Sequence, residues 1–460
     1  MKFYSNPVLE HADVPLSDDG QLESLIDACE RAHPHVAAGP RADRTGHECY
    51  VLSVHRPDEA SQVRPQLAEI VALVESLGDR VVGYECHALR RFDPRTFVGK
   101  GVAQRVADKA RAAGAEMLVV DAELSPSQAR NLEDVTGLPI CDREGVILNV
   151  FQRSARTPRA RVQVELAHLH YLRPRIRGIG LNMDKQAASM MKARGPGETA
   201  SELLARRLDA RVAELRRRWA QLERSAAEQR KGRDPCSRVV LLGYTNAGKT
   251  SLMNALSGAN LSVRNRPFET LDTTSRCLSR DGVEVLLSDT VGFIRRLPER
   301  LMDSFASTLA EVRQASLLLI VVDVTDPQWA YHLQVTADML SRLAADEIPA
   351  LVVFNKCDLL DPQFRSDGLP QQWSGWSTLC VSSRDPHAVS ELRQEILQRA
   401  RTRWDRGRLF VPYQHSSLQQ RIYARCQVLA VEAKERGCLF VVAAPPHVLR
   451  ELRAGCEAGR

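Results

Sequence analysis

The sequence contains no long uninterrupted run of apolar residues, which argues against a membrane-spanning helix. Such a helix needs roughly 18–20 consecutive apolar residues, whereas the most apolar stretch, Ser316–Val324, is interrupted by Asp323. The start of the chain also lacks the basic-then-apolar order of a secretory signal. We therefore expect a cytoplasmic protein without a transmembrane segment.

Clustered cysteines are missing too. The 11 cysteines are scattered singly, with no Cys-x-x-Cys pair and no Cys/His spacing typical of a metal site. Cys357 and Cys380 fall at the ends of expected buried strands, where a reduced thiol behaves as a small apolar residue. This usage favours a reducing environment, in which disulfides are rare.

Charge of one sign does not dominate the whole chain, but positive charge is concentrated in its middle. The formal net charge is only +6, yet Phe151–Cys236 holds 20 Lys and Arg against 9 Asp and Glu. The rest of the chain is therefore slightly acidic. A basic middle segment indicates a polyanionic partner, although a solvated Arg-rich helical face would give the same count.

Length and pattern divide the 460 residues into five parts, and a chain of this size has room for roughly three domains. Strand and helix patterns alternate in two parts, which indicates α/β units with mostly parallel sheets. We find no internal repeat. The expected parts are a weakly structured extension at 1–45, a small α/β subdomain at 46–157, a basic helical hairpin at 158–234, a P-loop domain with a doubly wound sheet at 235–404, and a small α+β unit at 405–460.

Cap and breaker residues set the expected helix ends. Ser125–Gly137 is expected to form a serine-capped helix. The first hairpin helix is expected to end at Pro174, because proline removes a helical hydrogen bond, and a Gly-punctuated connection follows. The second carries an apolar stripe at three- and four-residue spacing from Leu204 to Leu222. In the last part, we expect one helix over Ser416–Gly437, then a strand over Cys438–Pro445 and a short helix.

A phosphate-binding loop gives the strongest local signal. Gly243–Thr250 reads Gly-Tyr-Thr-Asn-Ala-Gly-Lys-Thr, follows an apolar strand and opens an amphipathic helix, as a P-loop requires. Its glycines let main-chain N–H groups converge on a β-phosphate. Lys249 would neutralise charge on the β- and γ-phosphates, and the Thr250 hydroxyl would ligate Mg²⁺.

A second motif selects guanine over adenine. The sequence Asn-Lys-Cys-Asp ends an apolar strand, and its Asn355 lies 105 residues after Thr250. Asp358 can accept the two edge N–H groups of guanine, whereas adenine would leave this carboxylate unpaired. Asn355 can hold the strand end and the base, and the stem of Lys356 can lie along the ring.

Three further segments complete the set in the order of a translation-factor-type GTPase. In Leu286–Phe293, Asp289 can reach Mg²⁺ through a water, and the Gly292 amide can bond the γ-phosphate. In Pro267–Arg276, several threonines compete to close over Mg²⁺ when a triphosphate is bound. A strand that ends near Ser382 suits main-chain contact with the guanine oxygen.

These motifs and several upstream phrases resemble the HflX GTPases of the Obg-related branch, over about residues 48–440. The upstream phrases are ELSPSQARNLE, DREGVIL, VQVELAHLHYL and RGPGE, and FETLD and DTVGFIRRLP follow in the P-loop domain. The resemblance selects Thr270 as the second threonine that ligates Mg²⁺. It also implies a ribosome-binding N-terminal region, binding to the large ribosomal subunit and its rRNA, and GTP-dependent splitting or rescue of stalled ribosomes by a protein that is monomeric when free.

The candidate site residues follow from the motifs together with this resemblance. The candidate catalytic residues are Lys249, Thr270 and Gly292, and the candidate metal ligands are Thr250, Thr270 and, through a water, Asp289. The candidate nucleotide-binding residues are Gly243, Tyr244, Thr245, Asn246, Ala247, Gly248, Lys249, Thr250, Ser251, Phe268, Glu269, Thr270, Leu271, Asp272, Asp289, Thr290, Val291, Gly292, Asn355, Lys356, Cys357, Asp358, Ser382, Ser383 and Arg384.

Phe293 stands where a GTPase is expected to carry a glutamine that orients the attacking water. Its side chain cannot hydrogen-bond to water, so we expect slow intrinsic hydrolysis that a partner accelerates. In the alternative, Phe293 only packs the switch helix, and another residue of the chain positions the water.

The chain departs from the family pattern at three places. Thr273 stands where proline is common, Ser-Ser-Arg at 382–384 replaces the usual Ser-Ala-Lys, and Leu181–Ala193 reads as an insertion at the hairpin tip. These changes keep open an alternative function, a GTP-switched scaffold that holds another RNA or protein. A nucleotide kinase is disfavoured, because it would need neither Asn-Lys-x-Asp nor the two switch segments.

Overall fold

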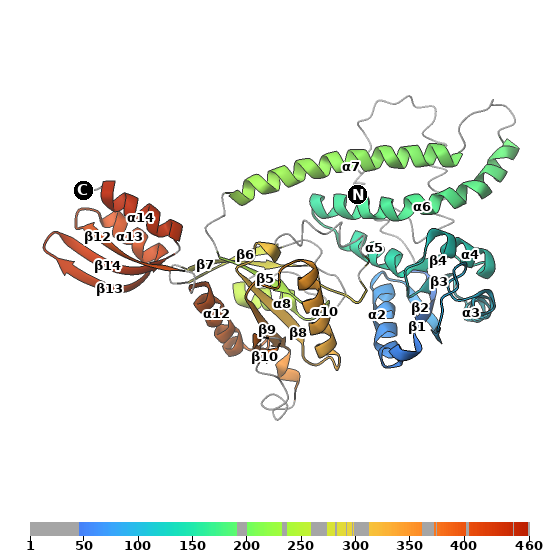
Figure 1. The fold of residues 1–460 in the computed structure, drawn as a ribbon, viewed down its shortest axis with the longest axis horizontal. Helices are drawn as coiled ribbons and strands as arrows, with labels where there is room; N and C mark the ends of the chain where they lie inside the picture. The colour runs from blue at the N-terminus through green and yellow to red at the C-terminus, as the bar shows by residue number, and fades with distance from the viewer. Residues whose placement is uncertain are drawn as a thin grey trace, which may run out of the picture. The chain divides into compact units, whose positions relative to one another are not determined.

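The structure, a computed structural model, contains an α/β unit, a helical hairpin, a second α/β unit and a small α+β unit, in this order along the chain (Figure 1). Among the described residues, no helix is both long and apolar enough to cross a membrane. The residues that the structure describes are 46–190, 200–231, 237–258, 274–280, 283–290, 292–296, 298, 312–360, 372–373, 375–401, 404–444 and 446–458.

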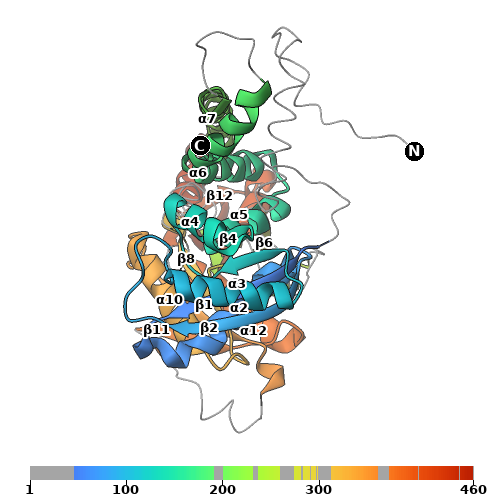
Figure 2. The ribbon, with the colours of Figure 1, turned by 90° about the vertical axis from the view of Figure 1, so that its right-hand side faces the viewer.

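The first α/β unit contains a parallel sheet, as the alternating pattern predicts. Its strands lie in the order β2-β1-β3-β4, and every neighbouring pair is parallel. Parallel neighbours need crossover connections, and helices supply them here (Figure 2). The strands are β1 (Glu48–His55), β2 (Arg80–Ala88), β3 (Met117–Val120) and β4 (Ile140–Asp142), and the helices are η2 (Pro57–Gln62), α2 (Val63–Ser76), α3 (Lys100–Ala112), α4 (Pro126–Thr136) and α5 (Arg143–Ser154).

Helix α4 shows how the local sequence sets these boundaries. The Ser125 hydroxyl accepts the Gln128 N–H at 3.2 Å, and the Gln128 side chain accepts the Ser125 N–H at 3.0 Å. This reciprocal pair satisfies two main-chain donors that a helix start leaves open. Gly137 ends the helix with a φ of 64°, which costs glycine little. The prediction of a serine-capped helix is confirmed.

The first hairpin helix is longer than expected, and the prediction that it ends at Pro174 is wrong. Helix α6 (Pro158–Met190) runs through Pro174, and the second helix is α7 (Ala200–Lys231). The Arg175 guanidinium donates to the Tyr171 carbonyl at 3.0 Å and lies over the Tyr171 ring at 3.6 Å. Side-chain contacts therefore support the helix at the point where proline removes a main-chain donor.

A buried carboxylate fixes this part of α6 to the first sheet. Asp142, at the end of β4, is 1% exposed. It accepts the Tyr171 hydroxyl at 2.8 Å, the Arg175 guanidinium at 2.7 Å, and the main-chain N–H groups of Leu124 and Gly145 at 3.1 and 2.9 Å. With four donors around it, the buried charge is well compensated.

Apolar residues join the hairpin helices where Val162–Leu169 of α6 meets Leu208–Leu222 of α7. The buried core is formed by Val162, Leu169, Val212 and Leu215, with Leu166, Leu208, Trp219 and Leu222 packed against it. The apolar stripe expected on the second helix therefore faces its partner helix, as helix pairing requires.

The second α/β unit has a seven-stranded sheet in the order β10-β11-β9-β8-β5-β7-β6. Its central strands are parallel, and β6 and β10 are antiparallel to their neighbours. This confirms the expected mostly parallel sheet of a P-loop domain. The strands are β5 (Ser237–Leu242), β6 (Thr274–Arg280), β7 (Val283–Asp289), β8 (Leu317–Asp323), β9 (Ala350–Asn355), β10 (Gln372–Trp373) and β11 (Trp376–Cys380), and the helices are α8 (Lys249–Ser257), α10 (Trp329–Arg342), η3 (Cys357–Leu359) and α12 (Pro386–Arg401).

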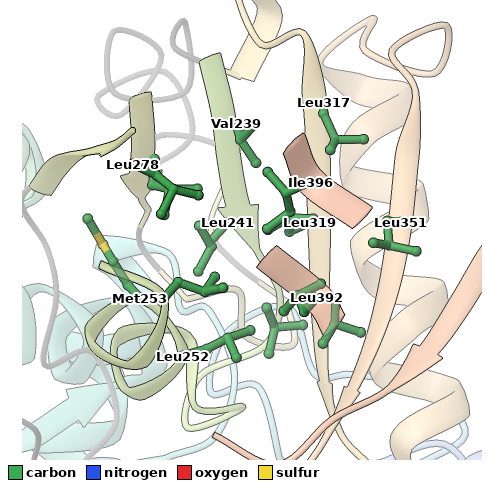
Figure 3. Packing of buried hydrophobic residues seen from close by; sticks show 14 of the residues in the cluster. Val239, Leu241, Leu252, Met253, Leu278, Leu317, Leu319, Leu351, Leu392 and Ile396 are labelled. Carbon is green, nitrogen blue, oxygen red and sulfur yellow. The ribbon is translucent and has the colours of Figure 1, made fainter. Parts of the chain in front are cut away.

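The core of this unit anchors the helix that follows the phosphate loop. Leu252 and Met253 of α8 and Leu392 and Ile396 of α12 pack against one face of the sheet with strand residues such as Leu319 (Figure 3). All five are fully buried. Because interiors are densely packed, this contact holds α8, and with it the loop before it, in one position.

In the last unit, a second helix prediction is wrong. The helix expected over Ser416–Gly437 ends as α13 at Arg425, and the residues after it form a strand. This strand, β13, pairs antiparallel with β14, so pairing outweighs the helical pattern. The elements are β12 (Asp405–Pro412), α13 (Ser416–Arg425), β13 (Gln427–Lys434), β14 (Gly437–Ala444) and α14 (Pro446–Ala458), with the sheet order β12-β14-β13.

Candidate nucleotide site

The phosphate loop links β5 to α8 at the carboxyl end of the parallel strands, where such sheets bind ligands. Two of its glycines stand where no side chain would fit. A Cβ on Gly243, which has a φ of 143°, would lie 2.1 Å from the Val321 carbonyl oxygen. A Cβ on Gly248, with a φ of 87°, would lie 2.3 Å from the Asn355 side-chain nitrogen. The loop can therefore take this path only with glycine at both positions.

Lys249 lies at the start of α8 and is 7% exposed. Its Nζ donates to the carbonyls of Gly243 at 3.1 Å and Tyr244 at 2.8 Å, so it spans the loop from inside. Burial lowers the pKa of Lys249 to about 8, and the Asp289 carboxylate acts in the opposite direction. A phosphate at this position would supply the negative charge that favours the protonated amine.

Asp289 and Thr250 meet beside the loop. The Thr250 hydroxyl donates to one Asp289 oxygen at 2.7 Å, while the other oxygen, Oδ1, is buried and has no hydrogen-bond partner among the described residues. Burial raises the pKa of Asp289, against the effects of Lys249 and Thr250. The Thr290 hydroxyl donates to the Leu241 carbonyl at 2.7 Å and fixes the strand end.

The segment after Asp289 is held against the phosphate loop by its main chain. The Thr245 N–H donates to the Phe293 carbonyl at 2.8 Å, and the Phe293 N–H donates to the Gly243 carbonyl at 3.0 Å. A Cβ on Gly292 would lie 3.0 Å from the Lys249 Nζ. The Gly292 main chain therefore lies beside the lysine that is expected to meet phosphate.

The Phe293 side chain is only 3% exposed, so it packs inside the unit. This burial agrees with the packing role that the sequence leaves open. The buried ring needs no hydrogen-bond partner, since phenylalanine has no donor or acceptor for water.

The guanine motif lies where β9 ends. The Asn355 amide donates to the Ala247 carbonyl at 2.9 Å and accepts the Ser383 N–H at 3.3 Å. Lys356, with a φ of 65°, donates to the Asn246 carbonyl at 3.1 Å and pairs with Asp323. These contacts bring the phosphate loop, the Asn-Lys-Cys-Asp motif and the Ser-Ser-Arg turn together.

Asp358 and the Ser-Ser-Arg turn complete this side. Asp358 is exposed, as a carboxylate that reads a base edge must be. Ser382 is 5% exposed, and its hydroxyl accepts the Arg384 N–H at 3.2 Å. Ser251, on α8, is half-buried. The candidate residues Phe268, Glu269, Thr270, Leu271, Asp272 and Val291 lie outside the described residues.

A group of side chains that the sequence motifs do not indicate surrounds Tyr244. Its ring stacks on His332 of α10 at 3.8 Å, and its hydroxyl accepts the Arg295 N–H at 2.9 Å. The Arg295 guanidinium, 3% exposed, lies 4.2 Å from the centre of the Tyr331 ring and bonds Gln328. Burial lowers the pKa of His332. These contacts join the phosphate loop, the segment after Asp289 and α10.

The expectation of reduced thiols is wrong for one pair. Cys357 and Cys380 form a disulfide, with Cα atoms 6.2 Å apart. Cys357 follows β9 and Cys380 ends β11; the two strands are neighbours, and Cys380 stands opposite Phe354 in their parallel register. The adjacency of the two strands is not readable from cysteine spacing, which explains why the sequence did not indicate the bond.

The fold and the site define a P-loop protein of the guanine-nucleotide class. The strand, loop and helix carry the phosphate motif, and Asn355 joins this loop to the elements expected to read the base. Three family models match: GTP-binding GTPase N-terminal at 64–152, GTP-binding GTPase Middle Region at 154–233, and 50S ribosome-binding GTPase at 238–356.

Curated relatives cover most of the chain. GTPase HflX of Gluconacetobacter diazotrophicus is 38% identical over 400 residues, which are 85% of this chain and 86% of the relative. GTPase HflX of Escherichia coli K12 is 34% identical over 372 residues, which are 80% and 85% of the two chains. The chain therefore belongs to the HflX family of GTPases and is a GTP hydrolase.

Solved structures also match. A GTP-binding protein from Sulfolobus solfataricus in complex with GDP covers 77% of this chain, and 98% of its own chain is matched, with 22% identity and a TM-score of 0.39. A crystal structure of an SsGBP and GDP complex covers the same shares of the two chains, with 22% identity and a TM-score of 0.43.

Proposed function

We propose that the chain is a cytoplasmic, ribosome-associated GTPase, monomeric when free, that binds the large ribosomal subunit and its rRNA. On this proposal it hydrolyses GTP to split or rescue stalled ribosomes. The observation that carries the proposal is the match of residues 238–356 to a family described as 50S ribosome-binding GTPase. The 85% coverage by an HflX relative supports it, since the N-terminal and middle regions match as well.

The hairpin supplies a surface suited to rRNA phosphates. On α7, Arg206, Arg216, Arg217 and Arg218 are exposed. Arg211 differs, because its guanidinium bonds Glu165 of α6 at 2.7 Å and Glu214 at 2.9 Å. A run of exposed arginines favours binding to an RNA backbone, because phosphates attract positive charge whatever the base sequence. Arg211 instead joins the two helices.

The residues of the phosphate side have distinct proposed roles. Lys249 would hold the β- and γ-phosphates, because its amine is already directed into the loop. Gly292 would offer its N–H to the γ-phosphate from beside Lys249. Thr270 would close over the site from the segment outside the described residues. Positioning and charge stabilisation are the main requirements of phosphoryl transfer.

Mg²⁺ is the ion expected beside nucleotide phosphates, and the donors fit it. The Thr250 hydroxyl and the Asp289 carboxylate are oxygen donors of the kind that Mg²⁺ prefers, and the unpartnered Asp289 Oδ1 is a buried acceptor with no other evident use. Thr250 and Thr270 would hold the ion, and Asp289 would hold it through a water. When bound, it neutralises charge that develops on the phosphates.

Water positioning is the step that this chain does not supply at the usual place. Phe293 is buried and apolar, so it cannot orient a nucleophile. We assign this role to a surface of the ribosome that completes the site. Slow hydrolysis in isolation and fast hydrolysis on the ribosome follow from this assignment.

Sedimentation with purified ribosomal subunits tests the proposal. With a non-hydrolysable GTP analogue, the protein should pellet with the large subunit, and with GDP it should mostly remain in the supernatant. Added to intact ribosomes with GTP, it should increase the proportion of free subunits. Absence from the large-subunit pellet with either nucleotide would contradict the proposal and favour the scaffold alternative, in which the hairpin holds another RNA or a protein.

A further inference from the structure

The Cys357–Cys380 disulfide connects the two loops of the base side of the site. Cys357 is the third residue of Asn-Lys-Cys-Asp and directly precedes Asp358. Cys380 closes β11, two residues before Ser382. The bond therefore joins the loop that would read the guanine edge to the loop that would contact the guanine oxygen.

Main-chain hydrogen bonds already connect these loops. The Val381 N–H donates to the Phe354 carbonyl at 2.8 Å, and the Cys357 N–H donates to the Val381 carbonyl at 3.3 Å. Phe354 and Val381 are each only 1% exposed, so these hydrogen bonds lie inside the unit. The disulfide adds a link that cannot open without a chemical reaction, so the two redox states differ in how freely the loops separate.

The other described cysteines differ from this pair. All seven lie outside this disulfide. Burial raises the pKa of Cys49 to about 12 and raises that of Cys141 well above its usual value, so both are poor nucleophiles. Cys380, by contrast, is half-buried, and its sulfur is bonded to that of Cys357, which is 4% exposed. One end of the disulfide is therefore the more open to attack by a small thiol.

We propose that Cys357 and Cys380 form a site of reversible thiol–disulfide exchange with low-molecular-weight thiols such as glutathione, and that its oxidation slows guanine-nucleotide release. The choice of partner rests on the cytoplasmic setting of the proposed function, because disulfides there are mostly transient and redox-sensing. The link to nucleotide release follows from the position of the bond between the Asn-Lys-Cys-Asp and Ser-Ser-Arg loops.

The exchange is balanced without any further reactant. In oxidation, the Cys380 thiolate attacks oxidised glutathione, forms a mixed disulfide and releases one glutathione thiol, which takes up a proton. The Cys357 thiolate then attacks the Cys380 sulfur, forms the internal disulfide and releases the second glutathione thiol. Reduction runs through the same mixed disulfide in reverse, with two glutathione thiols consumed and one oxidised glutathione formed.

The first test asks whether the pair exchanges. The full chain is equilibrated in buffers of different ratios of reduced to oxidised glutathione, alkylated at once, digested and analysed by mass spectrometry. Cys357 and Cys380 should be linked at oxidising ratios and both alkylated at reducing ratios, and Cys277, an exposed cysteine of β6 outside this disulfide, serves as the comparison. A pair that stays alkylated at every ratio, or linked at every ratio, would overturn the site.

The second test asks whether the bond acts on the nucleotide. Release of a fluorescent GDP analogue is timed by stopped flow for oxidised and reduced protein. Tethered loops should slow release by at least about threefold, since changes of this kind act mainly on dissociation rates. Cys380→Ser should release at the rate of the reduced protein in both conditions, and the control Cys277→Ser should keep the difference.

Equal release rates for oxidised and reduced protein would overturn the regulatory claim. Cys357→Ser provides a second variant, so a folding defect at one position does not decide the result. Neither test uses ribosomes. Failure here would leave the ribosome proposal standing, and failure to pellet with large subunits would leave this inference standing.

Discussion

Asn355 joins three segments of the nucleotide site through one side-chain amide. Its nitrogen donates to Ala247 of the phosphate loop, and its oxygen accepts the Ser383 N–H of the Ser-Ser-Arg turn. Its buried position leaves no space for a side chain on Gly248. The phosphate and base sides of the site are therefore held at one spacing, as recognition of a whole nucleotide requires.

Asp358→Asn tests base recognition most sharply. An amide offers a donor and a single acceptor in place of the carboxylate, so guanine loses charge-assisted hydrogen bonds worth about 10- to 100-fold in affinity. Xanthine, which carries an oxygen where guanine has an amino group, should bind the variant better than it binds the wild type. Equilibrium titration with fluorescent GDP and xanthosine diphosphate measures both.

Asp338→Asn is the matched control, because Asp338 is an exposed carboxylate on α10. It should leave both affinities unchanged. Equal guanine affinity for Asp358→Asn and the control would contradict the assigned role of Asp358.

The sequence motifs predicted where candidate residues lie on the fold only where the motif itself fixes the residue type. The phosphate loop, Asp289 and Asn-Lys-Cys-Asp lie where their motifs place them on strand ends. The stack of Tyr244 on His332 and the contact of Arg295 with Tyr331 were not predictable. Their partners come from different elements, and nothing in local spacing shows that α10 lies beside the loop.

At the scale of elements, two helix predictions failed for different reasons. Pro174 signals a helix end locally, but Arg175 and Asp142 form contacts that a local pattern cannot include. Residues Gln427–Lys434 fit a helical pattern, but they pair with β14 as a strand. In both cases a tertiary contact outweighs local preference. The short helix α4, whose signals are all local, was predicted correctly.

Asp142→Asn tests the contact that fixes α6. Removing one charge from the buried pair with Arg175 leaves an uncompensated guanidinium, which costs about 3–5 kcal/mol of stability. Hydrogen–deuterium exchange on the full chain should show lost protection in β4 and in α6 near Tyr171.

Glu48→Gln provides the control, because Glu48 pairs with Arg80 at 2.9 Å in an exposed position. Exposed pairs contribute about 0–1 kcal/mol, so exchange should hardly change. Equal protection in the two variants would contradict the anchoring role of Asp142.

The arginines of α7 are tested by the salt dependence of binding to large subunits. Replacing Arg216, Arg217 and Arg218 with glutamine should reduce the slope of log K against log salt by about 2–3, because each phosphate contact contributes nearly one unit. Arg211→Gln should leave the slope unchanged, since Arg211 bonds Glu165 and Glu214. An unchanged slope in the triple variant would exclude this face as the RNA-binding surface.

At the scale of the whole molecule, strand–helix alternation predicted the two α/β units, and their parallel and mostly parallel sheets confirm it. This alternation could not predict the order of the strands in each sheet, because that order depends on which strands pair across the fold. The disulfide at the base side follows from that order, as β9 and β11 are neighbours only in three dimensions. Family membership was predicted from long stretches of matching sequence, which are more specific to one family than any single motif is.

The central claim is that the chain hydrolyses GTP slowly until the large ribosomal subunit supplies the group that positions water. The most direct measurement is the rate of GTP hydrolysis at saturating GTP, with and without purified large ribosomal subunits. We predict a slow rate for the protein alone and an increase of about 10³–10⁵-fold with the subunits, the range that an externally supplied activating group provides. The same rate under both conditions would contradict the account.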